Sequence, residues 1–256
     1  MKQLLSRFVR GESTGLVAAL VLSLFLAAPQ AVAETPEEAI TKRLSEAVPG
    51  LRVDAVKESA VPGLYEVRTN NRDMIYATGD GQYILAGELL QLTDQGVVNV
   101  TEKARSGERA DTMAAFGDEG LITYPATGEQ KAEIDVFTDI DCPYCRKLHD
   151  EMDRLNELGI TVNYYAFPRS GPGTPSFTKY ESVWCADNQL EAMNRAKAGE
   201  KVSQASCDNP VADQYQLGRE VGVTGTPAIL TEDGNMIRGY IPADKLAQGL
   251  GLRALR

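Results

Sequence analysis

Four cysteines are the residues of this 256-residue chain best suited to covalent chemistry, and all of them lie in its second half. Cys142 and Cys145 are separated by two residues, which is the spacing of a redox pair. Four cysteines allow three disulfide pairings, and spacing alone does not choose among them. The redox spacing nevertheless favours pairing Cys142 with Cys145, and Cys185 with Cys207.

The chemistry of such a pair depends on a thiolate, because the protonated thiol is a poor nucleophile. A helix that starts at Cys142 would favour its thiolate through unpaired backbone N–H groups, and Pro143 suits the first turn. Cys145 would lie one turn later. We therefore predict that Cys142 is the nucleophile, ionised and exposed, and that Cys145 is the resolving thiol. Asp141 opposes ionisation unless it points to solvent.

A metal or haem site is disfavoured by the residues around the pair. Zinc requires four converging ligands, yet the chain has one histidine, and Cys185 and Cys207 form no second C-x-x-C. Covalent haem requires a histidine where Arg146 stands. His149 is tempting as a base, but we interpret it as a surface or packing residue. We expect no metal and no cofactor beyond the cysteine pair.

The elements around the pair predict an α/β domain. Leu148, Met152 and Leu155 give the helix after Cys145 one apolar face. We predict strands at 132–138, 160–167, 228–231 and 236–240, mostly helical structure over 175–220, and a final helix at 243–250. This order is that of a thioredoxin-like fold with a helical insertion.

The first half of the chain predicts a smaller unit. Thr35, Pro36 and Glu38 favour a helix start with a capping box, and the helix would run to about Val48. Short alternating segments between turn signals then predict an antiparallel sheet up to residue 100. So small a core favours association with a partner. Residues 101–116 predict a solvated linker helix, and 117–130 a looser connection, which makes the whole chain α+β.

The first 33 residues have the layout of a secretory signal peptide. Lys2, Arg7 and Arg10 precede an apolar run over 16–28, and Ala31 and Ala33 supply small residues before a cleavage site. An uncleaved anchor is the alternative, although the run is shorter than the roughly 20 residues that span a bilayer. The formal net charge of −10, without a basic cluster, argues against nucleic-acid binding.

Several segments together resemble the periplasmic protein-disulfide isomerases of the DsbC type. The similarity is strongest from Ile134 to Ala243. Residues 137–145 with 147–149 resemble that family's active-site segment, and 222–228 resemble its cis-proline loop. Residues 182–185 and 205–208 are similar to the segments that carry its second, structural disulfide, here Cys185–Cys207.

This resemblance implies a fold, a site and partners. It implies a homodimer joined through cystatin-like N-terminal domains, chaperone activity, and substrates that are misfolded, disulfide-containing exported proteins in the periplasm. It also implies a membrane thiol reductase of the DsbD type as a partner. Thr226 and Pro227 would be joined by a cis peptide, with the Thr226 backbone facing Cys142 and pairing with substrate. Tyr144 is exposed in this arrangement and could contact unfolded substrate or shield the disulfide.

Two departures leave alternatives open. Pro143-Tyr144 stands between the cysteines as in the related DsbG type, whereas Cys185 and Cys207 favour the DsbC type. Val136 stands where thioredoxins carry a buried acid. A DsbG-like reductase of sulfenylated cysteines is one alternative, and a holdase with purely structural cysteines is another. A dithiol oxidase is less favoured because it lacks the N-terminal module.

We predict four segments on these grounds: a signal peptide at 1–33, a dimerisation domain at 34–100, a linker helix and connection at 101–130, and a thioredoxin-like catalytic domain at 131–256.

Overall fold

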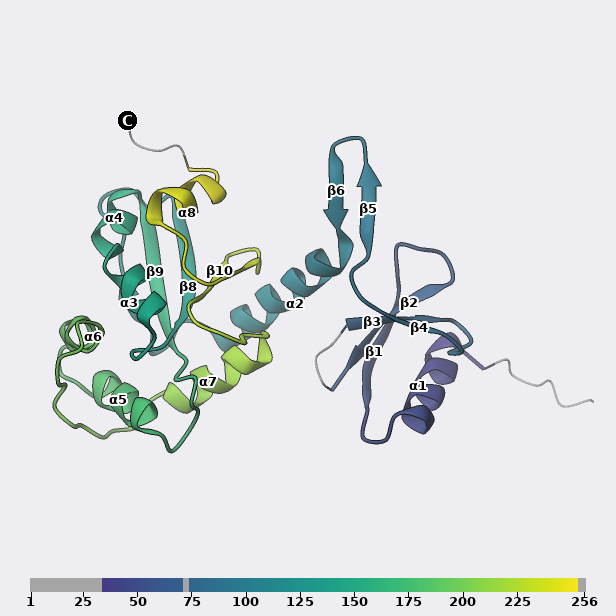
Figure 1. Ribbon diagram of the computed structural model, residues 1–256, viewed down its shortest axis with the longest axis horizontal. Coiled ribbons are helices and arrows are strands. Elements are labelled where there is room, and N and C mark those ends of the chain that lie inside the picture. Colours follow the sequence, from purple (N-terminus) through teal and green to yellow (C-terminus); the bar gives the residue numbers. More distant parts are fainter. Residues whose placement is uncertain (1–33, 71–73, 253–256) are drawn as a thin grey trace, which may run out of the picture. The chain divides into compact units, whose positions relative to one another are not determined.

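The computed structural model describes residues 34–70 and 74–252, so the predicted signal peptide lies outside the described residues. Helices and strands alternate in an α+β arrangement (Figure 1). None of the helices within the described ranges is long and apolar enough to cross a membrane.

Helix α1 (Pro36–Ala47) begins with the predicted capping box. The Thr35 hydroxyl accepts a hydrogen bond from the Glu38 backbone N–H at 3.3 Å, and the Glu38 carboxylate accepts one from the Thr35 N–H at 2.9 Å. Both bonds satisfy N–H groups that a helix start leaves unpaired. Ile40 and Leu44, one turn apart, form the buried face of the helix.

The first sheet is antiparallel, with strand order β1-β2-β3-β4. Its strands are β1 (Val53–Glu58), β2 (Leu64–Thr69), β3 (Met74–Thr78) and β4 (Ile84–Ala86). A separate hairpin follows, made of β5 (Leu90–Thr93) and β6 (Gly96–Asn99), where the sequence predicted one sheet up to residue 100. The core of this unit is small and centres on Ile40, Leu44, Val67 and Ala77.

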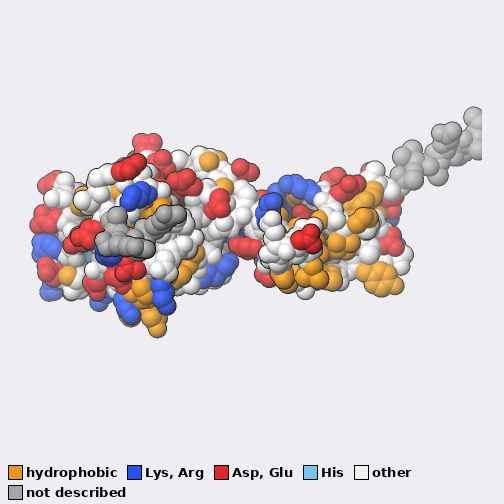
Figure 2. Space-filling model, turned by 90° about the horizontal axis from the view of Figure 1, so that it is seen from above, with side chains coloured by type: hydrophobic (Ala, Val, Ile, Leu, Met, Phe, Trp, Pro, Cys, Tyr) orange, Lys and Arg blue, Asp and Glu red, His pale blue; other side chains and the backbone are white. Residues whose placement is uncertain are grey.

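Large apolar side chains stay exposed on the last three of these strands and at the residue just before β4. The exposed residues are Tyr83, Ile84, Leu85, Leu90, Leu92, Val97 and Val98. In Figure 2, hydrophobic side chains gather on the right-hand part of the described residues. An apolar surface of this kind on strands that do not complete a core is typical of an association surface.

Helix α2 (Val100–Phe116) is not the fully solvated linker that its charged sequence predicts. Thr101, Arg109 and Met113 are buried, and the Arg109 guanidinium donates a 2.7 Å hydrogen bond to the Gly234 carbonyl. The expectation was wrong because Arg109 counts as polar in a sequence pattern, yet its stem can be buried when its head group is bonded.

The second sheet has strand order β11-β10-β8-β9-β7. Its strands are β7 (Ile122–Tyr124), β8 (Ala132–Thr138), β9 (Ile160–Ala166), β10 (Ala228–Thr231) and β11 (Met236–Arg238). Strands β8 and β9 are parallel, and all other neighbours are antiparallel. The segment predicted as a loose connection over 117–130 therefore contains the edge strand β7.

Helices cover both faces of this sheet (Figure 1). They are α3 (Pro143–His149), α4 (Met152–Glu157), α5 (Pro175–Trp184), α6 (Gln189–Lys197), α7 (Val211–Glu220) and α8 (Ala243–Gly249). Val136, Val162 and Tyr164 pack into the larger core with α3, α4, α5, α6 and α8. Phe137 and Tyr165 point to the other face, where they pack with residues of α2 and α7. The single helix predicted after Cys145 is divided into α3 and α4.

The register of β10 against β8 brings distant segments together. Ala228 pairs with Phe137 in the antiparallel ladder. Pro227 precedes β10, and the loop to α3 follows β8, so the two loops meet at the same edge of the sheet. In this way the sheet brings Cys142 into contact with Thr226, which lies 84 residues later in the chain.

Candidate active site

Cys142 is the residue that caps the N-terminus of α3, with Pro143 in the first helical position. Its thiol donates a hydrogen bond to the Thr226 carbonyl, with 3.2 Å between Sγ and O. The prediction that Cys142 is exposed was wrong, because only 2% of its surface is accessible. The proline loop, which comes from far along the chain, lies against the sulfur.

The environment of Cys142 favours its thiolate. Burial opposes ionisation, but the nearby Thr226 hydroxyl and the backbone N–H groups of Cys145 and Tyr144 outweigh it, so the pKa of Cys142 is lowered. Converging N–H groups at a helix start stabilise negative charge in this way.

The Thr226–Pro227 peptide bond is cis, as the resemblance implies. The Thr226 hydroxyl is buried and has no hydrogen-bond partner within the described part of the chain. It lies close enough to lower the pKa of both Cys142 and Cys145. An unpaired buried hydroxyl is costly, and a thiolate at Cys142 would give it an acceptor.

Cys145 is buried one turn into α3, and both cysteines are free thiols. The Cys145 sulfur accepts a hydrogen bond from the Asp139 backbone N–H at 3.3 Å. Burial raises the pKa of Cys145, and the charge of Lys197 partly opposes that rise. The two sulfurs are therefore unequal, with the thiolate favoured at Cys142 and the thiol at Cys145.

Asp141 does not simply point to solvent. Its carboxylate accepts hydrogen bonds from Lys179 Nζ at 2.7 and 2.8 Å and lies 3.5 Å from the Arg146 guanidinium. These two cations offset its charge beside Cys142. Asp141 and Arg146 also line an open pocket of about 550 Å³ whose lining includes neither Cys142 nor Cys145.

Asp139 is a buried carboxylate in the loop between β8 and α3. It accepts hydrogen bonds from the backbone N–H groups of Asp141 and Arg169, from the Arg169 guanidinium and from the Ser176 hydroxyl. Burial raises its pKa, but the bonds to Arg169 and Asp141 outweigh burial, so the pKa of Asp139 is lowered. This carboxylate holds the loop whose backbone N–H contacts Cys145.

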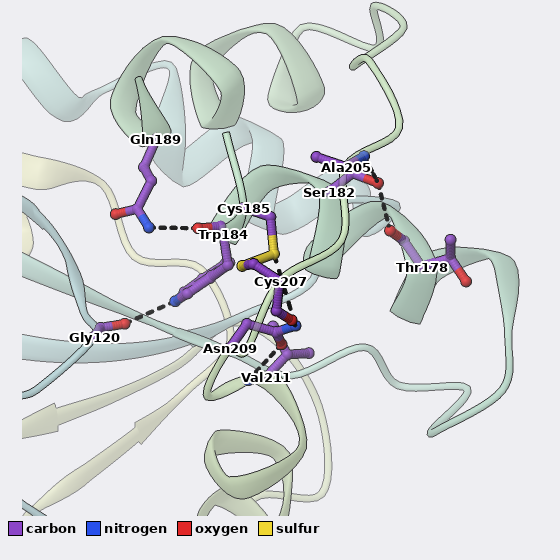
Figure 3. The surroundings of a disulfide bond; sticks show 10 residues. All are labelled: Gly120, Thr178, Ser182, Trp184, Cys185, Gln189, Ala205, Cys207, Asn209 and Val211. Carbon is purple, nitrogen blue, oxygen red and sulfur yellow. Dashed lines mark hydrogen bonds between the residues drawn. A yellow bond between two sulfur atoms is a disulfide. The ribbon is translucent and has the colours of Figure 1, made fainter. Parts of the chain in front are cut away.

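Cys185 and Cys207 form a disulfide, with 2.04 Å between the sulfurs. Figure 3 shows it at the end of α5, beside Trp184, whose indole N–H donates to the Gly120 carbonyl at 2.7 Å. The Asn209 side chain donates to the Cys207 carbonyl at 3.0 Å. The bond joins the end of α5 to the segment before α7.

Tyr144, Val136 and His149 complete the predicted positions. Tyr144 is 62% exposed, and Val136 is buried in the core. His149 is half-buried, with Nδ1 3.1 Å from the Tyr164 hydroxyl. No cluster of three or more His, Cys, Asp or Glu side chains able to hold a metal ion occurs in residues 34–70 and 74–252.

The single histidine should titrate far below its ordinary range. Burial, followed by the charge of Lys197, lowers the pKa of His149 to about 4. The unfolded chain then binds the proton more tightly, so this contribution to stability is complete above pH ~6.5 and falls by about 3 kcal/mol towards pH ~4. An NMR titration of the ring resonances gives the pKa, and denaturant unfolding of His149→Phe against the native chain isolates the acid loss. A midpoint near 6.5 would contradict the buried placement.

Two residues of the site were missed from the sequence. Neither Asp139 nor Lys197 was singled out from the sequence. Lys197 is 3% exposed, and its ammonium donates to Thr138 Oγ1 at 2.5 Å and to the Asp139 carbonyl at 3.2 Å. No sequence signal marks it, because it ends a short polar helix beside Arg195 and Glu200.

Known proteins resemble the chain over most of its length. Residues 118–252 match the thioredoxin-like domain family, and residues 31–102 match the N-terminal domain family of disulfide bond isomerase proteins. The thiol:disulfide interchange protein DsbC of Escherichia coli K12 is 36% identical over 230 residues, covering 90% of this chain and 94% of that protein. DsbC of Salmonella typhimurium is 38% identical, covering 86% and 90%. A disulfide interchange protein structure from Neisseria gonorrhoeae is 28% identical, covers 53% of this chain and 96% of its own, and has a TM-score of 0.47.

Proposed function

Because the chain belongs to the DsbC family of thiol:disulfide interchange proteins, we propose that it rearranges wrong disulfides in misfolded exported proteins through Cys142 and Cys145. One observation carries the proposal. Cys142 stands at the start of α3 with its Sγ 3.2 Å from the Thr226 carbonyl, and its surroundings lower the pKa of the Cys142 thiol. A nucleophilic thiol beside a backbone carbonyl can attack a disulfide while the substrate chain lies along the loop.

The reaction begins when the Cys142 thiolate attacks a substrate disulfide. A bond forms between Cys142 and one substrate sulfur, and the other substrate sulfur leaves as a thiolate. A second substrate thiolate can then displace Cys142, which leaves the protein reduced and the substrate rearranged. Alternatively, Cys145 displaces the substrate, so the protein pair is oxidised and the substrate disulfide is reduced to two thiols.

Substrate contacts are assigned to three residues. The Thr226 backbone would pair with the substrate chain and Pro227 would shape the loop that binds it, which is supported by the 3.2 Å contact between the Thr226 carbonyl and Cys142 Sγ. Tyr144 would contact apolar substrate side chains, since its ring is largely exposed at the start of α3. Cys185–Cys207 would be a structural bond, worth about 3 kcal/mol for a loop of this length.

Assembly and location complete the proposal. A homodimer formed through residues 34–100 is supported by the exposed apolar strands β4 to β6, and a shared apolar surface would give chaperone activity. Residues 1–33 would direct export to the periplasm, and a membrane reductase of the DsbD type would keep Cys142 reduced. We divide the remainder into a linker at 101–130, which includes strand β7, and a catalytic domain at 131–256.

Refolding of a protein with scrambled disulfides tests the function. We expect the reduced chain, added in catalytic amount to a glutathione buffer, to restore the substrate's activity faster than the buffer alone. Pro143-Tyr144 favours the DsbG-like alternative, which would reduce a sulfenylated peptide without speeding this refolding. A rate equal to that of glutathione alone would remove the isomerase proposal.

A further inference from the structure

Lys197 at the end of α6 is a buried cation to which the proposed reaction assigns no step. Its hydrogen bonds go to Thr138 and to the Asp139 carbonyl, and its ammonium lies 5.3 Å from the centre of the Tyr164 ring. Within the described residues, no carboxylate forms an ion pair with it. The nearest candidate, Asp139, directs its carboxylate to Arg169 instead.

Lys197 and the resolving thiol of Cys145 both contact the backbone of the same residue. Asp139 connects the two, because its carbonyl accepts from Lys197 and its N–H donates to Cys145 Sγ. Ionisable groups face Lys197 from α3, from the loop before it and from β9, namely Cys142, Cys145, Arg146, His149, Asp139 and Tyr164. Of these charges, a thiolate at Cys145 would act most strongly on the ammonium, ahead of Asp139 and Cys142.

We propose that Lys197 is a positioning residue for the interchange reaction, and that its buried ammonium stabilises the Cys145 thiolate and so speeds release of substrate from Cys142. This inference rests on the proposed function, in which Cys145 resolves the mixed disulfide. Burial lowers the pKa of Lys197 to about 8, so the side chain is mostly charged at neutral pH.

The step that Lys197 assists is balanced without another reactant. The Cys145 thiol gives its proton to solvent, and its thiolate attacks Cys142 Sγ. A bond forms between Cys142 and Cys145, the bond between Cys142 and the substrate sulfur breaks, and the substrate thiolate takes up a proton. The protein pair is oxidised and the substrate is reduced. A more stable Cys145 thiolate is a weaker nucleophile, but the gain in thiolate fraction is larger while the thiol is mostly protonated.

The rate of resolution by Cys145 determines whether the substrate disulfide is reduced or rearranged. Fast resolution by Cys145 favours reduction of the substrate, whereas slow resolution leaves time for a substrate thiol to attack and complete a rearrangement. Lys197 would therefore shift the balance towards reduction.

Neutral variants at position 197 test the proposal. Reduced protein is mixed with oxidised glutathione, quenched with acid and separated by mass into the mixed disulfide and the internal disulfide. In Lys197→Met and Lys197→Gln we expect the mixed disulfide to resolve roughly threefold to tenfold more slowly at neutral pH. Lys197→Arg should keep most of the native rate. Lys201→Met, which removes an exposed lysine from the segment after α6, should match the native chain.

Two titrations separate this electrostatic role from a structural one. In a Cys142→Ser background, the ultraviolet absorbance of the thiolate reports Cys145, and Lys197→Met should move its midpoint to higher pH. In the same variant, NMR should show the His149 pKa rising from about 4, because the charge of Lys197 helps to lower it. An unchanged Cys145 midpoint together with an unchanged resolution rate would overturn the proposal.

A second measurement leaves Lys197 intact, in case the neutral variants do not fold. By linkage, a thiolate that Lys197 stabilises must also stabilise the ammonium. NMR of the lysine side chain should show Lys197 holding its proton to higher pH in the reduced native chain than in Cys145→Ser, and equal values would contradict the coupling. If the native chain itself never forms the Cys142–Cys145 bond, the proposed function fails instead, and the two failures are distinguishable.

Discussion

A Cys142→Ser chain should lose disulfide interchange almost completely while it remains folded. We expect its effect on scrambled-substrate refolding to fall by at least about a thousandfold, to the rate of glutathione alone, because a serine hydroxyl does not ionise near neutral pH. The substitution exchanges sulfur for oxygen at a helix cap, a position that serine favours, so the unfolding free energy should change little. Refolding rates and a denaturant curve measured on the same preparation check both parts.

Cys145→Ser is the matched control, since it removes the other sulfur of the pair. This variant should still attack substrate disulfides, but it should accumulate mixed disulfides that reducing agent releases and that mass spectrometry detects. Together the two variants assign the roles of the sulfurs. Full refolding activity in Cys142→Ser would favour a holdase with structural cysteines and would count against the mechanism.

The location of the cysteine pair could be predicted because local rules determine it. Cys142, Pro143 and Cys145 satisfy the requirements of a helix start, and the apolar positions after Cys145 predict the face that packs on the sheet. The same is true of Thr35 and Glu38, whose capping box depends on residues three apart. Interactions between residues three or four positions apart depend only on neighbouring residue types, so they can be predicted from the sequence.

The covering of Cys142 could not be predicted in this way. Its low exposure depends on Thr226, which reaches the sulfur only through the pairing of β10 with β8. The family resemblance supplied the proximity of the two segments, but proximity alone does not indicate how much surface remains accessible. The exposed fraction of a side chain at a loop contact depends on side-chain volumes and on the distance between the two backbones. The periodicity of the sequence predicts neither.

Lys197 and strand β7 were missed for a related reason. Ile122–Tyr124 is three residues long and becomes a strand by pairing with β9, so its own pattern is too short to mark it. Lys197 belongs to a helix whose polar residues predict a solvated surface, yet it ends that helix against the β8–α3 loop. Tertiary contacts overrode the local preference in both segments.

The hydrogen bonds of Asp139 affect both the stability of the catalytic domain and the geometry of the cysteine site. Asp139→Ala should lower the free energy of unfolding by about 3 kcal/mol, because two backbone N–H groups in a buried loop and the Arg169 guanidinium lose their acceptor. Since the pKa of Asp139 is lowered on folding, its contribution is present above the unfolded value of about 4 and is lost as pH falls through the folded value. Denaturant unfolding at neutral and acidic pH should therefore show the variant and the native chain converging in acid.

Asp135, which lies on β8 four residues before Asp139, is the matched comparison, because its environment shifts the carboxyl pKa in the opposite direction. Burial raises the pKa of Asp135 to about 6, so its charged form is disfavoured in the folded chain, and Asp135→Asn should stabilise the protein at neutral pH. Asp139→Ala should also slow closure of the Cys142–Cys145 bond, because the N–H that reaches Cys145 belongs to the loosened loop. Asp135 lies on the sheet face opposite Val136 and should leave that rate unchanged. Equal destabilisation by the two substitutions would mean that burial alone, rather than the bonds to Arg169 and Asp141, governs this loop.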